Sequence, residues 1–471
     1  MLTFDSGSLN ANALVVGFLY PNGSNSVVAG TVNVNGGTLT VVSNIVLASR
    51  PAVGGTGSAQ GALNVDGGTV LATNISGAGG ASTINLKSGA IDLNGGQIAG
   101  ITMLNIGNGL SAPAQLSDAA SIASPNTINI ASNGRLEGDT VITAPQLVIN
   151  GAISPGGDDV GWVTNNGSVT LGADGLYLFD MSDAIGREGT NWDLLAVSGS
   201  LNVQATIANP FVVQLRSIDG NPNDNLPGAA DFGNGSAQTW LVATISGGIS
   251  NFSPGKFRVD DSEFANDLCG GYFMIQTNSG GSALLLSFVP NNPPSADDVA
   301  VYLSRSGILQ IPILTLAANW TDPDGDPVTL AGVNSSSANG SNNVSSDGAF
   351  IYYTNSTFIA DTIIYSVADV RTNPPAAYRA GDTVRTATGL IHLLPPPVIS
   401  SVVSSGGNLT FSGSNGAPGG NYYVLAATNV LVPISQWQPI ATNSFDSSGN
   451  FQSTIILTPN TPHQFYLLQL P

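Results

Sequence analysis

The stretch Gly30–Thr40, GTVNVNGGTLT, repeats along the first part of the chain. It recurs as Gly61–Val70, GALNVDGGTV, and in a looser form as Thr83–Ile91, TINLKSGAI. In each copy an aliphatic residue alternates with a polar one, a turn of small residues follows, and the alternation resumes. Alternation with a period of two is typical of a β-strand with one buried face. A strand-and-turn unit that repeats in series predicts a solenoid, in which each unit buries its apolar face against its neighbours.

The composition fits a folded chain of several domains and argues against two classes of partner. The chain has 471 residues, of which 42% are hydrophobic, so large β cores can form. Only 9% of the residues are charged, and the formal net charge is −19. The 11 basic residues are scattered, whereas surfaces that bind nucleic acid or anionic membranes need clustered Lys and Arg. We therefore expect neither partner, and no apolar run is long enough to predict a membrane span.

Residues 1–160 are expected to form stacked coils of about 20 residues each, with insertions. Four asparagines occupy matching places in these coils: Asn33, Asn64, Asn85 and Asn129. The glycine pairs that follow some of them, such as Gly36-Gly37, suit corners that need positive φ. The asparagines either stack as ladders between coils or serve the turns. The turn is favoured because asparagine is a common turn residue.

The start of the chain and its cysteine content indicate where the protein is found. Met1 leads directly into LTFDSGSLN, without a basic n-region, an apolar h-region or a cleavage site. The solenoid thus begins in mid-repeat, and we expect the sequence to be a fragment whose export signal lies upstream. Cys269 is the only cysteine, so no intrachain disulfide can form. This fits a secreted bacterial protein whose stability does not depend on disulfides.

The repeats resemble a known bacterial family. VNVNGGTL at Val32–Leu39 and LNVDGGTV at Leu63–Val70 look like the autotransporter-associated β-strand repeats of passenger domains. Three later segments follow in the order found at the end of such passengers: LVINGAISPGG at Leu147–Gly157, SVTL at Ser168–Leu171 and WDLLAVSGSL at Trp192–Leu201. The resemblance implies a right-handed parallel β-helix. An outer-membrane β-barrel does not follow in this sequence, so the resemblance does not imply self-translocation.

Residues 161–290 are expected to remain all-β and to cap the β-helix, because an uncovered last coil would leave an edge open to aggregation. Strands are predicted at Leu176–Asp180, Leu194–Val203, Phe211–Leu215, Trp240–Ile245, Tyr272–Gln276 and Ala283–Phe288. Four aromatic residues are predicted to fill the core of this cap: Phe179, Trp192, Trp240 and Phe273. An aromatic platform for sugars is the alternative.

Val289–Asp298, VPNNPPSADD, predicts an extended linker without a core of its own. The following residues resemble a bacterial cadherin-like or immunoglobulin-like (Ig-like) repeat. The resemblance rests on DPDGD at Asp322–Asp326, DGAFIY at Asp347–Tyr352 and IIYSVAD at Ile363–Asp369. It implies a β-sandwich over residues 291–394.

A second linker, LPPPV at Leu394–Val398, precedes a last module over residues 395–471. Strands are predicted at Asn408–Ser412, Tyr422–Ala427, Gln436–Ala441, Ser453–Leu457 and Gln464–Leu468. The module resembles fibronectin-like or Ig-like C-terminal modules of large secreted bacterial proteins. Tyr423 and Trp437 are predicted to pack its core. The predicted fold is therefore all-β: a right-handed parallel β-helix (1–160), its β cap (161–290) and two small β-sandwiches (291–394 and 395–471).

The acidic turn Asp322–Asp326 is the strongest candidate for a chemical site. Three carboxylates alternate over the turn, and Ca²⁺ takes six to eight hard oxygen ligands. We predict a calcium site with the ligand set Asp322, Asp324, Asp326, Asp297, Asp298 and Asp369. The last three would reach the turn across the module, as cadherin-like repeats imply. The turn is not an EF-hand loop, and a solvated acidic turn is the alternative.

No constellation in the sequence indicates catalysis, and we expect a non-enzymatic protein. A glycosidase needs two carboxyl groups that face one bond, and the only mixed charged cluster is Arg135, Glu137 and Asp139 on one strand. Such a cluster is more typical of a surface ion pair. His392 and His463 have no evident catalytic partners, and no nucleotide-binding motif opens a helix.

The features above predict a secreted or cell-surface structural or adhesion protein, a β-helix stalk followed by Ig-like spacer or attachment modules. The sparse charge and small side chains suit a long, protease-resistant surface. The alternative is a carbohydrate-binding or polysaccharide-degrading β-helix protein. Glycans or cell-surface components are the expected partners in either case. The sequence names neither the ligand nor the oligomeric state.

Overall fold

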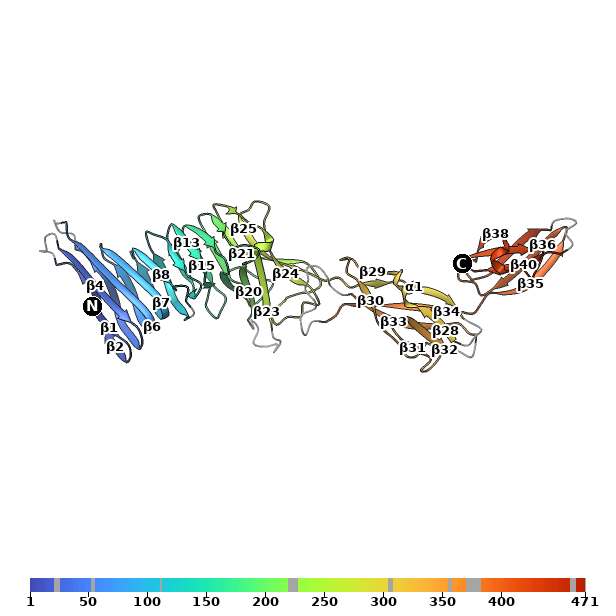
Figure 1. Cartoon of the computed structure of the whole chain (residues 1–471), viewed down its shortest axis with the longest axis horizontal. Helices are drawn as coiled ribbons and strands as arrows, with labels where there is room; N and C mark the ends of the chain where they lie inside the picture. The colour runs from blue at the N-terminus through green and yellow to red at the C-terminus, as the bar shows by residue number, and fades with distance from the viewer. Residues whose placement is uncertain are drawn as a thin grey trace. The chain divides into compact units, whose positions relative to one another are not determined.

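The computed structural model describes residues 1–20, 26–51, 56–110, 112–218, 228–303, 308–354, 358–369, 383–457 and 463–470. Within them the chain is almost entirely β, which confirms the predicted all-β fold: strands β1 to β40 occur beside one short α-helix and two 3-10 turns. The chain divides into two compact units, Met1–Pro290 and Asn291–Pro471 (Figure 1). No helix in these ranges is long and apolar enough to cross a membrane. The finer division into four parts stays a prediction.

Parallel pairing dominates the first unit. Its strands are β1 (Leu2–Phe4), β2 (Ser8–Ala11), β3 (Leu14–Phe18), β4 (Val27–Val34), β5 (Thr38–Ser49), β6 (Ser58–Gly77), β7 (Ala81–Ala99), β8 (Met103–Ile106), β9 (Ala114–Ala123), β10 (Ile128–Ile130), β11 (Gly134–Glu137), β12 (Thr140–Thr143), β13 (Gln146–Ile149), β14 (Ala152–Ser154), β15 (Trp162–Asn165), β16 (Ser168–Leu171), β17 (Leu176–Met181), β18 (Leu194–Val197), β19 (Leu201–Val203), β20 (Phe211–Ser217), β21 (Gln238–Ile245), β22 (Ile249–Ser250), β23 (Phe257–Glu263), β24 (Tyr272–Thr277) and β25 (Ala283–Val289). Among these named strands, antiparallel pairing is confined to the end of the unit, where β25 pairs with β21 and β24.

The register of the parallel ladders repeats the sequence pattern. Asn33 on β4 is in register with Asn64 on β6, and Asn64 with Asn85 on β7. The alternation places the flanking aliphatic residues inside, as Val32 and Val34 show by their nearly complete burial. Figure 1 shows these strands side by side at the blue end of the chain. The period-two pattern therefore fixes both the strand and the face that it buries.

The outward asparagines form a hydrogen-bonded ladder. The Asn64 amide donates to Asn33 Oδ1 (2.8 Å), Asn85 to Asn64 (2.9 Å) and Asn105 to Asn85 (2.9 Å). For Asn33, Asn64 and Asn85 the interpretation as turn formers was therefore wrong. Each amide both donates and accepts between neighbouring strands, an arrangement that in-register parallel stacking makes possible. Asn105 was missed in the sequence, although it divides the long interval between Asn85 and Asn129 and a glycine turn at Gly107 and Gly109 follows its strand.

One apolar core runs through the first unit, from Val16 to Phe288. Aliphatic side chains fill its N-terminal part, and aromatic side chains fill the end that contains the antiparallel strands. The four aromatic residues that were predicted to lie in the core are all buried: Phe179, Trp192, Trp240 and Phe273. Their burial confirms the core role and excludes an exposed aromatic platform made of them. Phe232 packs among them, with its ring centroid 5.1 Å from that of Phe288.

A buried ionic cluster lies beside this aromatic region. The Asp180 carboxylate is fully buried and accepts hydrogen bonds from Nε and Nη2 of Arg216, both at 2.6 Å. Asp193, also fully buried, accepts N–H bonds from Gly161 (2.7 Å) and Asp180 (3.0 Å). Burial raises the pKa of Asp193 well above its ordinary value, and the Asp180 charge adds to that rise. The amide bonds oppose the rise but do not cancel it.

The second unit contains several smaller sheets. Its elements are β26 (Ser295–Ala296), β27 (Val299–Tyr302), β28 (Ile308–Pro312), α1 (Ile313–Ala317), β29 (Trp320–Thr321), β30 (Val328–Val333), β31 (Val344–Ser346), β32 (Phe350–Thr354), β33 (Asp361–Asp369), β34 (Thr386–Leu394), β35 (Val398–Ser405), β36 (Asn408–Ser414), β37 (Asn421–Ala427), β38 (Gln438–Ser444), β39 (Phe451–Ile456) and β40 (Phe465–Gln469). The sheet β27-β34-β33-β30 and the sheet β28-β32-β31 share one apolar core. The sheets β35-β36-β39 and β38-β37-β40 share another.

The core of the last two sheets corrects one prediction. Tyr422, not Tyr423, is buried there, together with Phe411, Phe445 and Phe451. Neighbouring residues on a strand face opposite sides, so an error of one position exchanges the inner and outer tyrosine. Trp437 lies outside this core cluster, before β38, where its Nε1 donates to the Val432 carbonyl (3.2 Å).

We predict that Asn85→Thr destabilises the first unit. Threonine has the higher β propensity, so propensity alone would favour the variant. The substitution, however, leaves the Asn105 amide and the Asn64 oxygen without their ladder partner, which costs roughly 1–3 kcal/mol. Urea unfolding followed by tryptophan fluorescence would measure the loss. Asn129→Thr is the matched control, because Asn129 is exposed and, although it is in register with Asn105, the described residues show no ladder bond between the two. Equal effects of the two substitutions would contradict a stabilising ladder.

We also predict that Asp193→Asn changes how stability depends on pH. Because the folded state raises the pKa of Asp193, its contribution is most favourable at low pH and is lost as the pH rises through the folded pKa. The unfolding free energy of the native protein minus that of the variant should therefore fall with rising pH. Urea unfolding from about pH 3 to about pH 7 brackets the ordinary aspartate pKa.

Asp174→Asn, which removes one exposed carboxylate from a left-handed turn, is the control for net charge. A difference between the native protein and Asp193→Asn that stays constant over this pH range would show that Asp193 does not titrate as proposed.

Candidate metal site

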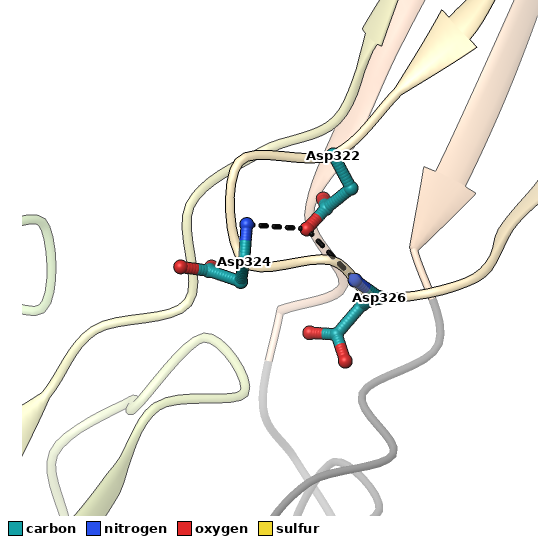
Figure 2. Close-up of side chains that lie close together, drawn as sticks. All are labelled: Asp322, Asp324 and Asp326. Atoms are coloured by element: carbon teal, nitrogen blue, oxygen red, sulfur yellow. Dashed lines mark hydrogen bonds between the residues drawn. The ribbon is translucent and has the colours of Figure 1, made fainter.

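The acidic turn joins β29 to β30 and is closed by its own backbone. Asp322 Oδ1 accepts the N–H groups of Asp324 (2.8 Å) and Asp326 (3.2 Å), and Gly325 N–H bonds the Asp322 carbonyl (3.2 Å). Figure 2 shows the Asp322 side chain turned toward those two amides. Gly325 has φ +79°, a conformation that glycine adopts without strain. The sequence Asp-Pro-Asp-Gly-Asp thus folds locally into this turn.

The turn gathers three carboxylates. One oxygen each from Asp322, Asp324 and Asp326 lies within 4.8 Å of the others. Asp326 is 8% exposed, whereas Asp324 is exposed. Asp322 Oδ2 is buried and has no hydrogen-bond partner in the described part of the chain. The turn therefore combines concentrated negative charge with one buried oxygen that its own hydrogen bonds leave unused.

The segment that enters the module is fixed to this turn. The Asn292 backbone N–H and its side-chain amide donate to the two oxygens of Asp324, at 2.6 and 3.0 Å. Asn291 is 1% exposed and donates to Asp369 Oδ2 (2.7 Å), while its carbonyl accepts from Arg385 Nε (3.1 Å). The predicted linker is therefore anchored at its asparagines. Sequence reasoning missed this role, although the pair Asn291-Asn292 before two prolines was visible.

The other predicted ligands lie outside the group of three. The Asp369 carboxylate accepts from Asn291, and Asp369 is in register with Val328, two residues beyond Asp326. Asp298 accepts the Leu390 N–H (3.1 Å), and its other oxygen lies 3.5 Å from His392 Nε2. Asp297 is exposed, and its backbone N–H bonds the Asn319 carbonyl (3.1 Å). The structure thus brings together three of the six predicted ligands.

The donor set fits a hard divalent cation. Carboxylate oxygens are the ligands that Ca²⁺ prefers, and three carboxylates this close repel one another unless a cation or hydrogen-bond donors compensate. The buried Asp322 Oδ2 supplies an oxygen that needs such compensation. Three carboxylates supply fewer than the six or more oxygens of a complete calcium shell, so backbone or water oxygens would have to supply the rest.

The charged cluster in the first unit forms an ion pair. Arg135 Nε lies 2.7 Å from Glu137 Oε2, and Gln115 also donates to Glu137. Asp139 instead accepts the backbone N–H of Trp162 (2.8 Å). Glu137 is thus neutralised by Arg135, while Asp139 is engaged by the backbone. His463 lies in a short segment before β40, and the structure records no catalytic grouping around it in the described residues.

One comparison with known proteins bears on the second unit. Residues 291–377 match a family model described as a bacterial Ig domain. The match includes the acidic turn and supports the Ig-like part of the predicted resemblance, while the passenger-type resemblance of the first unit stays a prediction. The strand β34 lies beyond the matched residues but pairs with β27 and β33, so the sheet extends past them. No curated protein and no solved structure matches the chain.

Proposed function

We propose that the chain is a non-enzymatic scaffold of a secreted or surface-exposed bacterial protein, and that Met1–Pro290 is a right-handed parallel β-helix with a C-terminal β cap. Up to β16, the parallel ladders join residues about 20 to 30 apart in sequence, the spacing of solenoid coils. Right-handed crossovers make up about 98% of parallel connections, which supports this hand. The antiparallel strands β21, β24 and β25 act as the cap.

The second unit acts in this proposal as an Ig-like spacer over 291–394 followed by a fibronectin-like module over 395–471. The bacterial Ig domain match supports a surface or adhesion role. The low charge density and acidic balance of the chain fit an exposed, soluble surface. A spacer between a surface and a partner must transmit force without opening.

One observation carries the spacer role: the first long strand and the last strand of the Ig-like module are parallel partners. Residues Val299–Tyr302 of β27 pair with Ile391–Leu394 of β34, and the Leu303 N–H continues the ladder to the Leu394 carbonyl (2.8 Å). The chain enters the module before β27 and leaves it after β34. Pulling on these two ends shears the ladder lengthwise, so its hydrogen bonds are loaded together rather than one by one.

The last module lacks that arrangement. Its first strand, β35, belongs to the sheet β35-β36-β39, and its last strand, β40, belongs to the sheet β38-β37-β40. In the described residues no ladder joins β35 to β40. Tension on its ends is therefore opposed by the packing between two small sheets, whose core is also the smaller of the two in this unit.

We further propose that the turn Asp322–Asp326 binds Ca²⁺ and stiffens the entry to the Ig-like module. Asp322, Asp324 and Asp326 would hold the ion, which would supply positive charge for carboxylates that otherwise repel one another. Asn292, bonded to Asp324, links the entering segment to that site. This proposal is a refinement of the spacer and not a condition for it.

We predict that the Ig-like module opens at a higher force than the last module when the whole chain is pulled by its ends. Single-molecule force spectroscopy distinguishes the two by the length of chain that each releases. Val301→Pro replaces a residue of β27 with one that has no backbone N–H. The substitution should therefore lower the opening force of the Ig-like module.

Ile351→Val in β32 is the control for the pulling experiment. It removes one methylene group from the core and costs about 0.5–1.5 kcal/mol. Because Ile351 lies outside the β27–β34 ladder, the variant should lower thermal stability with a smaller effect on the opening force. Opening of both modules at the same force, or no effect of Val301→Pro, would contradict a load-bearing spacer.

We predict that millimolar calcium raises the unfolding temperature of the second unit in the whole chain, relative to EGTA. A ligand that binds only the folded state stabilises it by about 2.7 kcal/mol at a hundredfold excess over Kd. Asp322→Asn should remove the shift, because it keeps Oδ1 for the turn amides but replaces the buried second oxygen. Scanning calorimetry measures both.

Asp298→Asn should keep the calcium shift, because Asp298 faces β34 rather than the turn. A native protein that unfolds at the same temperature in calcium and in EGTA would overturn the calcium site. An equal calcium shift in the native protein and in Asp322→Asn would do the same. Neither outcome affects the force prediction.

A further inference from the structure

The strand β35 is an edge strand of the last module and is exposed along its whole length. It pairs with β36 and, among the described strands, with no other. Its eight residues are all exposed, and four of them are aliphatic: Val398, Ile399, Val402 and Val403. The open side of an edge strand carries N–H and C=O groups that a strand from another chain can pair with. The strand β35 therefore combines an apolar surface with an open ladder.

This edge lacks the charges that commonly prevent edge strands from associating. Soluble proteins often place a charged residue or a proline on an exposed edge. The strand β35 contains neither. The whole module over 395–471 has one acidic residue, Asp446, and no Lys or Arg, whereas the chain as a whole has a formal net charge of −19. Two copies of this module can therefore approach each other with little electrostatic repulsion.

The turn after β35 determines which of its backbone groups bond to β36. Gly406 and Gly407 have φ values of +56° and +81°, as in a two-residue type I′ hairpin. In such a hairpin the flanking pair, here Ser405 and Asn408, is hydrogen bonded, and bonded pairs alternate with unbonded pairs along the ladder. By this alternation Val402 belongs to an unbonded pair. Its N–H and C=O groups therefore point to the open side of β35.

A shift of register gives a second aliphatic residue the same orientation. Val402 lies opposite Phe411 and Ile399 lies opposite Gly413, so β35 has one residue more than β36 in this interval. Because Phe411 and Gly413 are two residues apart, Ile399 shares both the face and the backbone orientation of Val402. This face is that of the core, since Phe411 is buried. Val402 is nevertheless 61% exposed and Ile399 47%, so the core face continues to an open edge.

The sequence of β35 is complementary to itself. Val398–Val403, VISSVV, has the same pattern from either end: two aliphatic residues, two serines and two aliphatic residues. In an antiparallel pair of two copies related by a two-fold axis between the serines, Ile399 of each copy lies opposite Val402 of the other. In the same pair, Val398 lies opposite Val403. Aliphatic side chains thus meet aliphatic side chains on both sides of the axis.

The register shift is what makes this pairing possible. Directly opposite residues of an antiparallel pair must lie on the same face of the sheet. In a regular strand, two residues three positions apart lie on opposite faces. The shift in β35 places Ile399 and Val402 on one face. The side chain of Ser400, within the shifted segment, donates to the Ser412 carbonyl on β36 (3.3 Å), which holds this segment against its own sheet.

We propose that two copies of the chain associate through β35, which pairs antiparallel to its own copy and joins the sheets β35-β36-β39 of the two copies into one continuous sheet. The ladder is short, because Pro397 precedes it and has no N–H. A short ladder with few apolar contacts forms a weak, reversible dimer. The inference goes beyond the scaffold role and requires neither the spacer nor the calcium site.

Sedimentation velocity of the whole chain, from about 1 μM to about 1 mM, covers the range of weak association. The sedimentation coefficient of the native protein should rise from that of a monomer toward that of a dimer. Val402→Lys should raise the Kd of the dimer at least about tenfold, because it removes an apolar contact and places like charges on both copies of a short ladder. Val402 is exposed, so the thermal unfolding of the dilute monomer should stay as in the native protein.

Ile456→Lys is the matched control. Ile456 is an exposed aliphatic residue on β39, the opposite edge strand of the same sheet, and its substitution changes the charge by the same amount. The dimer should form in this variant as in the native protein. The proposal is overturned if the native protein stays a monomer up to the highest concentration, or if Val402→Lys associates as tightly as the native protein.

Disulfide crosslinking tests the register. The double variant Val398→Cys/Val403→Cys should form covalent dimers on mild oxidation, because residue 398 of one copy lies opposite residue 403 of the other. Within one copy the two positions are about 15 Å apart along the strand, beyond the reach of a disulfide. The two single variants are the controls, and the buried Cys269 is common to all three proteins. Absence of covalent dimers from the double variant, or equal crosslinking of a single variant, would overturn this pairing.

Discussion

In-register parallel pairing is the constraint on which the first unit depends. Because residues in register on successive strands face one another, any property of one position is repeated from strand to strand. Aliphatic positions such as Val34 and Val65 are fully buried and continue one core, and asparagine positions such as Asn64 and Asn85 continue one ladder. Core and ladder are two consequences of one register.

The sequence predicted the parts of this arrangement that depend on local periodicity. The alternation of GTVNVNGGTLT identified strands and their inner faces. The burial of Phe179, Trp192, Trp240 and Phe273 was predicted on a different ground, because aromatic residues commonly fill β cores. The ladder was considered but not favoured, because a side-chain bond between strands depends on register, which insertions such as the one between β5 and β6 conceal. Tyr423 was assigned to the core in place of Tyr422 because two adjacent aromatic residues fit the alternation equally well in either phase.

In the acidic turn, too, contacts between residues close in sequence could be predicted, whereas contacts between residues far apart in sequence could not. Asp322, Asp324 and Asp326 lie together because the five-residue turn places them there, and this much could be predicted. Asp298 could not be placed, because its position depends on the pairing of β27 with β34, nearly a hundred residues later. The anchoring of Asn292 to Asp324 also depends on the fold of the whole module. Side chains brought to a site by non-local strand pairing are those that sequence reasoning misses.

Parallel pairing has different structural consequences in the two units. In the first unit each parallel ladder joins two strands in register, so it sets which side chains stand beside one another on the surface. In the Ig-like module the one parallel ladder among its named strands joins the segments where the chain enters and leaves, so it sets how tension is distributed. A parallel ladder between chain ends resists shear, and a series of parallel ladders between successive strands repeats a side-chain pattern. The same hydrogen-bond geometry therefore repeats a side-chain pattern in one part of the chain and joins the two ends of a module in the other.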